Sequence, residues 1–179
     1  MDDSQLIQKI AVIGNIAGGK TWLARRLAQI HNLPLTHVDS IHFLPGLKIR
    51  PTAEARELIL EIENQTSWII DGYGPLDLIE KRFAKADRLV LVDLPLARHL
   101  WWCSKRQIKN LFTKREELPE ACNEASWQHT QKLFQTLWKM HLQMRPELLR
   151  ILAREPLREK VISIHSLSEL KFYSLKGLT

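Results

Sequence analysis

The sequence predicts an α/β fold in which a parallel β-sheet is covered by helices on both faces. Short apolar runs typical of buried parallel strands alternate with longer segments of helical periodicity. A glycine-rich segment, residues 14–21, lies between the first apolar run and the first helical segment. The 179 residues contain no internal repeat, low-complexity segment or Gly/Ser linker, so we expect a single domain over 1–179.

Each predicted strand is followed by at least one predicted helix. The strands cover residues 10–13, 35–38, 67–70, 88–92 and 160–164. The helices cover residues 21–30, 52–65 (with Thr52 as N-cap), 76–84, 96–112, 126–153 and 167–175. Parallel strands all end at one edge of their sheet, and ligands bind beyond that edge. We therefore expect the segments that follow the strands to carry the chemistry.

The segment from Gly14 to Thr21 fits the G-x-x-x-x-G-K-[ST] spacing of a phosphate-binding P-loop. Its glycines let the backbone turn tightly, so that successive N–H groups point at negative charge. Lys20 adds a cation for the β- and γ-phosphates, and the Thr21 hydroxyl is a ligand for Mg²⁺. The helix that follows directs its positive N-terminal end at the same anion. The motif predicts that the chain binds a nucleotide polyphosphate.

The residues predicted to hold the nucleotide are those of the loop and the residue that follows it. They are Gly14, Asn15, Ile16, Ala17, Gly18, Gly19, Lys20, Thr21 and Trp22. Trp22 is bulky for a position where small residues are common, and its side chain is not expected to reach the phosphates.

Three aspartates come at the ends of predicted strands, at the same edge as the loop. Asp93 is in the place of a Walker B aspartate and is predicted to hold Mg²⁺ through a water; the alternative is a helix cap. Asp39 is predicted to accept a proton from the acceptor hydroxyl, or to hold that hydroxyl in line with the γ-phosphate, the alternative being a turn residue. Asp71 either orients the acceptor or forms a turn before Gly72.

Basic residues gather in the segment 105–115, and the net charge of the chain is +6. Arg106 and Arg115 are predicted to neutralise charge during phosphoryl transfer, the alternative being a solvated helix face. The charge also fits a nucleic-acid partner. Because no helix-turn-helix or other recognition motif is visible, that partner is not favoured.

The sequence argues against several other classes of protein. No apolar run reaches the ~18 residues of a membrane span, and residues 1–5 are acidic where a signal peptide is basic, so we expect a cytoplasmic protein without a membrane partner. Cys103 and Cys122 have no metal-ligand spacing and are expected to be reduced thiols. The histidines show no metal-ligand pattern, and none is assigned a catalytic role. The oligomeric state is left open.

Taken together, the P-loop, Asp39, residues 68–72 (WIIDG), residues 86–95 (ADRLVLVDLP) and the basic helix identify a resemblance. The chain resembles the adenylate-kinase-related P-loop kinases and, within them, the bacterial topology modulation proteins. The resemblance covers almost the whole chain. It implies a P-loop NTPase three-layer α/β/α sandwich, with a five-stranded parallel sheet in the order 2-3-1-4-5 and ATP and Mg²⁺ as cofactors.

The resemblance also implies a helical lid that closes on the phosphates. By position the lid matches residues 106–123, which makes Arg106 and Arg115 the lid arginines. Adenine is expected to pack near residues 165–167, after the fifth strand.

One departure concerns the acceptor. Adenylate kinases follow the third strand with Asp-Gly-Phe-Pro-Arg, whose arginine binds the acceptor phosphate, but residues 71–75 read DGYGP. Arg50 and Arg82 are candidate substitutes. The acceptor is thus either a nucleotide or a small hydroxylated metabolite held by Asp39, as in shikimate- or gluconate-kinase-like relatives.

The predicted function is an ATP-dependent phosphotransferase that moves the γ-phosphoryl group of Mg·ATP to a small-molecule acceptor. The alternative is an ATP-binding, nucleic-acid-associated regulator of DNA topology that has no such kinase activity.

Overall fold

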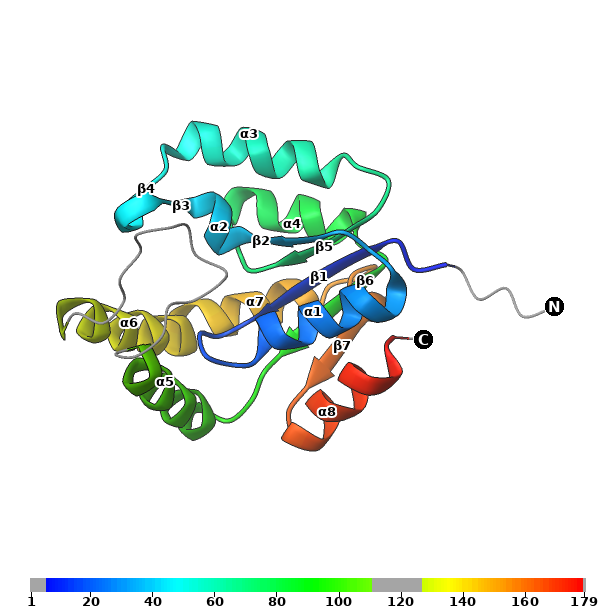
Figure 1. The fold of residues 1–179 in the computed structure, drawn as a ribbon. Coiled ribbons are helices and arrows are strands. Elements are labelled where there is room, and N and C mark those ends of the chain that lie inside the picture. The colour runs from blue at the N-terminus through cyan, green and yellow to red at the C-terminus, as the bar shows by residue number, and fades with distance from the viewer. Residues whose placement is uncertain (1–5, 111–126, 179) are drawn as a thin grey trace.

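The structure is a computed structural model that describes residues 6–110 and 127–178 (Figure 1). Arg115 and the greater part of the predicted lid, 106–123, lie outside the described residues.

The main sheet has five parallel strands in the order β2-β5-β1-β6-β7. Their bounds are β1 Lys9–Gly14, β2 Leu35–His37, β5 Trp68–Asp71, β6 Arg88–Val92 and β7 Val161–Ile164. Numbered within this sheet alone, the strands follow the expected order 2-3-1-4-5. The labels differ because a small antiparallel hairpin, β3 Phe43–Leu44 and β4 Lys48–Ile49, lies between β2 and β5 in the chain and was not predicted.

Helices cover both faces of the sheet, which confirms the predicted α/β class (Figure 1). The α-helices are α1 Lys20–His31, α2 Val38–His42, α3 Thr52–Glu63, α4 Leu76–Lys85, α5 Leu96–Asn110, α6 Trp127–Lys139, α7 Arg145–Leu152 and α8 Leu167–Lys176. Three further turns are η1 Pro45–Leu47, η2 Met140–Met144 and η3 Arg158–Lys160. Helices α1 and α8 pack on one face, and α3, α4 and α7 pack on the other.

Strand β1 shows why the core has two halves. Its residues 10–13 are fully buried, and their side chains alternate between the two faces. Ala11 and Ile13 join the cluster under α3, α4 and α7, whereas Ile10 and Val12 join the cluster under α1. A strand buried on both faces needs a continuous apolar run, which is why the sequence shows one here.

The predicted helix 126–153 is in fact interrupted by a π-helical turn, η2, between α6 and α7. Pro146 is at the start of α7 and has no N–H to donate to the preceding turn, so an uninterrupted α-helical ladder is impossible there.

Two expected boundaries were also wrong. The second strand ends at His37, and Asp39 lies inside the short helix α2, where the Ser40 hydroxyl donates to the His37 carbonyl at 2.7 Å. Thr52 is the first residue of α3 and does not cap it; Pro51 is in the N-cap position.

Candidate functional site

The P-loop leaves the buried strand β1 and enters α1. Gly14 has φ 143°, and a Cβ placed on it would lie 2.2 Å from the Val92 carbonyl oxygen, so only glycine fits at this point. Gly19 is the N-cap of α1 with φ 82°. The strand, loop and helix therefore have the arrangement that the motif requires.

Lys20 and Asn15 hold the two ends of the loop together. The Lys20 Nζ donates to the Asn15 carbonyl oxygen at 2.8 Å, which keeps the ammonium group over the loop. The Asn15 side chain accepts from the Ile16 N–H at 2.7 Å and donates to the Leu137 carbonyl of α6 at 3.2 Å. Asn15 is 8% exposed, so water competes little for these hydrogen bonds. The bond to Leu137 therefore anchors the loop to α6.

Thr21 is hydrogen-bonded to a carboxylate at the end of the neighbouring strand. Its hydroxyl donates to Asp71 Oδ2 at 2.7 Å, and His37 Nδ1 lies 3.1 Å from the same oxygen. Asp71 reaches this place because β5 pairs with β1 in the register Val12 to Asp71. Asp71 is 6% exposed, and its Oδ1 is buried with no hydrogen-bond partner among the described residues.

Asp93 has a different partner. Arg145 donates to it from Nε at 2.6 Å and from Nη2 at 2.7 Å, so both carboxylate oxygens accept from one guanidinium. This hydrogen bonding raises the pKa of Arg145. His165 Nδ1 is 3.8 Å from Asp93 Oδ2. The structure therefore pairs Thr21 with Asp71, while Asp93, the other predicted magnesium ligand, is paired with Arg145.

Asp39 and Arg50, the residues predicted to bind the acceptor, follow β2, which is separated from β1 and the P-loop by β5. Asp39 is exposed on α2. Arg50 donates from Nε to the Ile41 carbonyl at 2.7 Å, and its Nη1 is 3.6 Å from Glu54. Both residues belong to the segment between β2 and α3, which faces solvent more than the P-loop does.

Arg82 is fully buried and supports the loop after β5. Its Nε donates to Glu63 Oε1 at 2.8 Å, and its Nη1 donates to the carbonyls of Gly72 and Tyr73 at 3.1 and 2.8 Å. Since the guanidinium is inside the core, Arg82 is a structural residue and a poor substitute for the missing acceptor arginine.

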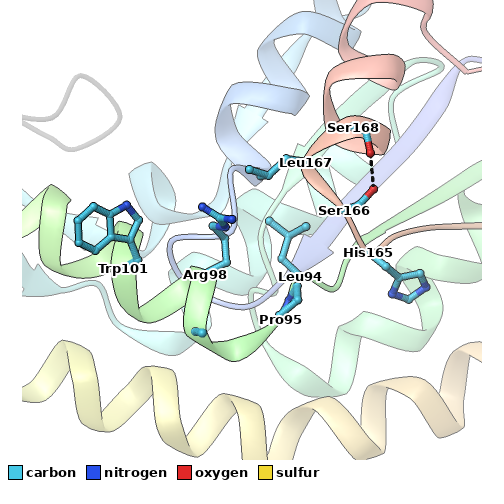
Figure 2. Close-up of a pocket in the computed structure, with 9 residues that line it drawn as sticks. Leu94, Pro95, Arg98, Trp101, His165, Ser166, Leu167 and Ser168 are labelled. Carbon is cyan, nitrogen blue, oxygen red and sulfur yellow. Dashed lines mark hydrogen bonds between the residues drawn. The ribbon is translucent and has the colours of Figure 1, made fainter.

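A pocket of about 480 Å³ opens between the start of α5 and the loop that joins β7 to α8 (Figure 2). Its lining is Leu94, Pro95, Ala97, Arg98, Trp101, His165, Ser166, Leu167 and Ser168. It includes residues 165–167, where adenine was expected. The Ser166 hydroxyl caps α8 by accepting from the Glu169 N–H at 3.2 Å, and Glu169 Oε2 accepts from the His165 N–H at 2.7 Å. This capping fixes one wall of the pocket.

Arg106 is half-buried near the end of α5, at the start of the predicted lid. Helices α5 and α6 lie side by side beyond the end of the sheet (Figure 1). The described part of the chain thus places Arg106 on a helix that passes the P-loop.

Sequence reasoning missed three site residues. His37 contacts Asp71, His99 contacts the P-loop, and Arg145 binds Asp93. His37 could have been found, since it lies two residues before Asp39 at a strand end. His99 and Arg145 are isolated residues on helices, and no local pattern distinguishes them.

Comparison with known proteins gives matches only at the level of structure. No family model matches the chain, and no curated protein does. A shikimate kinase from Acinetobacter baumannii in complex with shikimate matches with a TM-score of 0.58 at 15% identity, over 95% of this chain and 90% of that chain. The chain has the fold of the P-loop kinases.

Two further solved structures agree with this fold. A sugar kinase from Janibacter sp. HTCC2649 matches with a TM-score of 0.52 at 17% identity, over 94% of this chain and 92% of that chain. A gluconokinase from Sinorhizobium meliloti 1021 matches with a TM-score of 0.50 at 12% identity, over 96% of this chain and 91% of that chain. At such identities the likeness concerns the fold alone.

Among the described residues, no helix has both the length and the apolar character needed to span a membrane.

Proposed function

We propose that this chain is a P-loop kinase that transfers the γ-phosphoryl group of Mg·ATP to a small-molecule acceptor. The observation that carries the proposal is the pairing of the Thr21 hydroxyl with Asp71, a buried carboxylate, beside a complete P-loop. A kinase needs a phosphate cradle, a cation site and a positioned acceptor, and the chain offers residues for each of them.

The residues at Thr21 fit a magnesium ion. Mg²⁺ prefers oxygen ligands and keeps several waters. The Thr21 hydroxyl is one such oxygen, and Asp71 Oδ1, which lacks a partner among the described residues, can accept from a water on the ion. We therefore assign Asp71 to the ion; Asp93, expected in this role, would first have to release Arg145.

Thr21 and Asp71 would hold Mg²⁺, which would supply positive charge against the negative charge that develops on the phosphates. The backbone N–H groups of residues 14–20 would hold the phosphates, and Lys20 would exchange the Asn15 carbonyl for phosphate oxygens. Asp39 would take the proton of the acceptor hydroxyl. The acceptor oxygen would then bond to the γ-phosphorus, while the bond between the γ-phosphorus and the bridging β-phosphate oxygen breaks and ADP leaves. Arg106 and Arg115 would stabilise the transferring group.

The pocket in Figure 2 is the proposed place of the adenine ring. Its walls are mainly apolar, through Leu94, Trp101 and Leu167, and Arg98 supplies a planar cation that stacks on aromatic rings.

The acceptor is proposed to be a small hydroxylated metabolite or a nucleotide. Two of the matched structures are named for kinases of hydroxylated metabolites, and the chain has no arginine in residues 71–75 to bind an acceptor phosphate. Hydroxylated metabolites are therefore the first class to screen. The alternative function is that of an ATP-binding, nucleic-acid-associated regulator. It rests on the sequence resemblance to topology modulation proteins and on the net charge of +6.

The test is calorimetric titration with Mg·ATP, followed by a screen of hydroxylated metabolites and nucleoside monophosphates for ADP release. Lys20→Ala is expected to lower turnover by about 100- to 1,000-fold, as removal of a charge-stabilising donor does. A wild-type protein that binds no Mg·ATP, or a Lys20→Ala variant that turns over as fast as wild type, would contradict the proposal. Binding to duplex DNA that weakens steeply with salt would favour the alternative.

A further inference from the structure

We propose that His99 is a positioning residue that orients the peptide between Ile16 and Ala17, so that the Ala17 N–H faces the phosphate. The inference rests on the proposed function for the identity of the bound anion. His99 lies on α5, outside the P-loop motif, and is 1% exposed. Its Nδ1 is 2.8 Å from the Ile16 carbonyl oxygen. Because a carbonyl oxygen only accepts, Nδ1 carries the proton.

The direction of this hydrogen bond determines where the next N–H points. In a trans peptide the C=O and the N–H point in opposite directions. His99 holds the Ile16 carbonyl on the α5 side of the loop, so the Ala17 N–H points to the other side. The Ile16 N–H is already bound by the Asn15 side chain at 2.7 Å. Ala17 thus supplies an N–H to the cradle that Ile16 does not.

Ala17 is held in a conformation that a non-glycine residue rarely adopts. Its φ is 53°, in the left-handed region, which is unfavourable for a residue with a Cβ. Such a conformation persists only where the surroundings impose it. The hydrogen bond from His99 fixes the peptide on the N-terminal side of Ala17 and so supplies that constraint.

The same imidazole also packs against the next residue of the loop. A Cβ placed on Gly18 would lie 2.8 Å from His99 Cε1, so the ring touches the backbone at Gly18. One turn further along α5, Trp102 lies 3.3 Å from a Cβ placed on Gly19. Helix α5, which also carries Arg106, therefore supports the P-loop at successive positions.

The test compares His99→Leu with His99→Asn. Leucine fills much of the space of the ring but donates no hydrogen bond, whereas the asparagine amide carries an N–H close to the position of Nδ1. The first measurement is exchange of the Ile16 amide in nucleotide-free protein, followed by NMR. Asn15 binds this amide, so it exchanges only when the loop opens, and loss of the His99 bond should make opening easier. The second is the Kd for Mg·ATP, measured by calorimetry.

In H99L the Ile16 amide is expected to exchange about 10-fold faster, and the Kd to rise about 10-fold, the size of one lost hydrogen bond. In H99N both values are expected to stay within about 3-fold of wild type. His31→Leu is the matched control: His31 accepts from the Leu178 N–H at 3.0 Å at the far end of α1, and its loss should change neither value.

An unchanged Kd or an unchanged Ile16 exchange rate in H99L would overturn the proposal, as would losses of equal size in H99N and H99L. If H99L does not fold, His99→Gln replaces it, because its amide reaches the position of Nε2 and should not restore the bond. If wild type binds no Mg·ATP, the proposed function fails, and the exchange rates alone then decide the role of His99.

Discussion

The ends of β5 and β6 lie on either side of β1, and each carries an aspartate, but the two carboxylates have different partners. At Asp71 the Thr21 hydroxyl and His37 share one oxygen, and the other oxygen has no partner among the described residues. At Asp93 both oxygens accept from Arg145. A carboxylate paired in this way is already neutralised, whereas Asp71 keeps an oxygen that can accept from a water on a cation. A place at a strand end is therefore not enough to assign a metal carboxylate.

The largest expected effect comes from replacing each aspartate by its amide. Asp71→Asn is expected to lower turnover about 10- to 100-fold, because residues that support a metal from behind its direct ligands have effects of that size. Asp93→Asn should lower it much less. ADP release, with the best acceptor from the screen or with water, measures both. Equal losses in the two variants would remove the distinction between the two strand ends.

A smaller effect is expected at the second strand end. Arg145→Ala leaves the Asp93 carboxylate without its partner and should lower the free energy of unfolding by about 1 kcal/mol. The value is below that of a buried charged pair because the Arg145 side chain is 39% exposed and its charge is screened by water. Urea unfolding measures the change. Arg145→Lys keeps the charge but cannot bind both oxygens, so it should lower the free energy of unfolding by less than Arg145→Ala does. An equal decrease in the two variants would show that the bidentate geometry is essential.

The smallest effect concerns pH. Burial lowers the pKa of His99 below its usual 6.5, and the nearby Lys20 acts in the same direction. The hydrogen bonds to the backbone of Ile16 and Leu94 and the charge of Asp93 act against this shift without reversing it. The folded protein then binds fewer protons than the unfolded chain, so His99 contributes stability that is fully present above pH 6.5 and is lost as pH falls through the lowered pKa. Burial lowers the pKa of His31 as well.

Thermal melting between pH 7.5 and about 5, the range around the ordinary histidine pKa, measures this loss. His99→Asn keeps the hydrogen bond but does not titrate, so its stability should fall less over this range than that of wild type. The same fall in both proteins would show that His99 does not contribute. The lowered pKa of Glu169 acts only below 4.5, outside this range.

The sequence predicts the sheet and the P-loop well because both depend on local patterns. Strands buried on both faces need continuous apolar runs, and Arg88–Val92 is found as expected. The P-loop spacing follows from the chemistry of phosphate binding. The break at η2 and the β3–β4 hairpin were not predicted, since one depends on a single proline and the other on strands of two residues each.

The choice between Asp71 and Asp93 could not be made from sequence because it depends on partners distant in the chain. Thr21 and Asp71 are 50 residues apart and meet through the β1–β5 register, and Arg145 is 52 residues from Asp93. His99 reaches Ile16 across 83 residues. The roles of Arg106 and of Asp39 stay predictions.

The measurement that tests the account most directly is the Mg²⁺ dependence of ATP binding. Calorimetric titrations of ATP with and without Mg²⁺ would be compared for wild type, Asp71→Asn and Asp93→Asn. We predict that Mg²⁺ tightens binding to wild type about 10-fold or more, that this gain is largely lost in Asp71→Asn, and that it is kept in Asp93→Asn. A gain that survives in Asp71→Asn and disappears in Asp93→Asn would contradict the assignment of Asp71 to the ion.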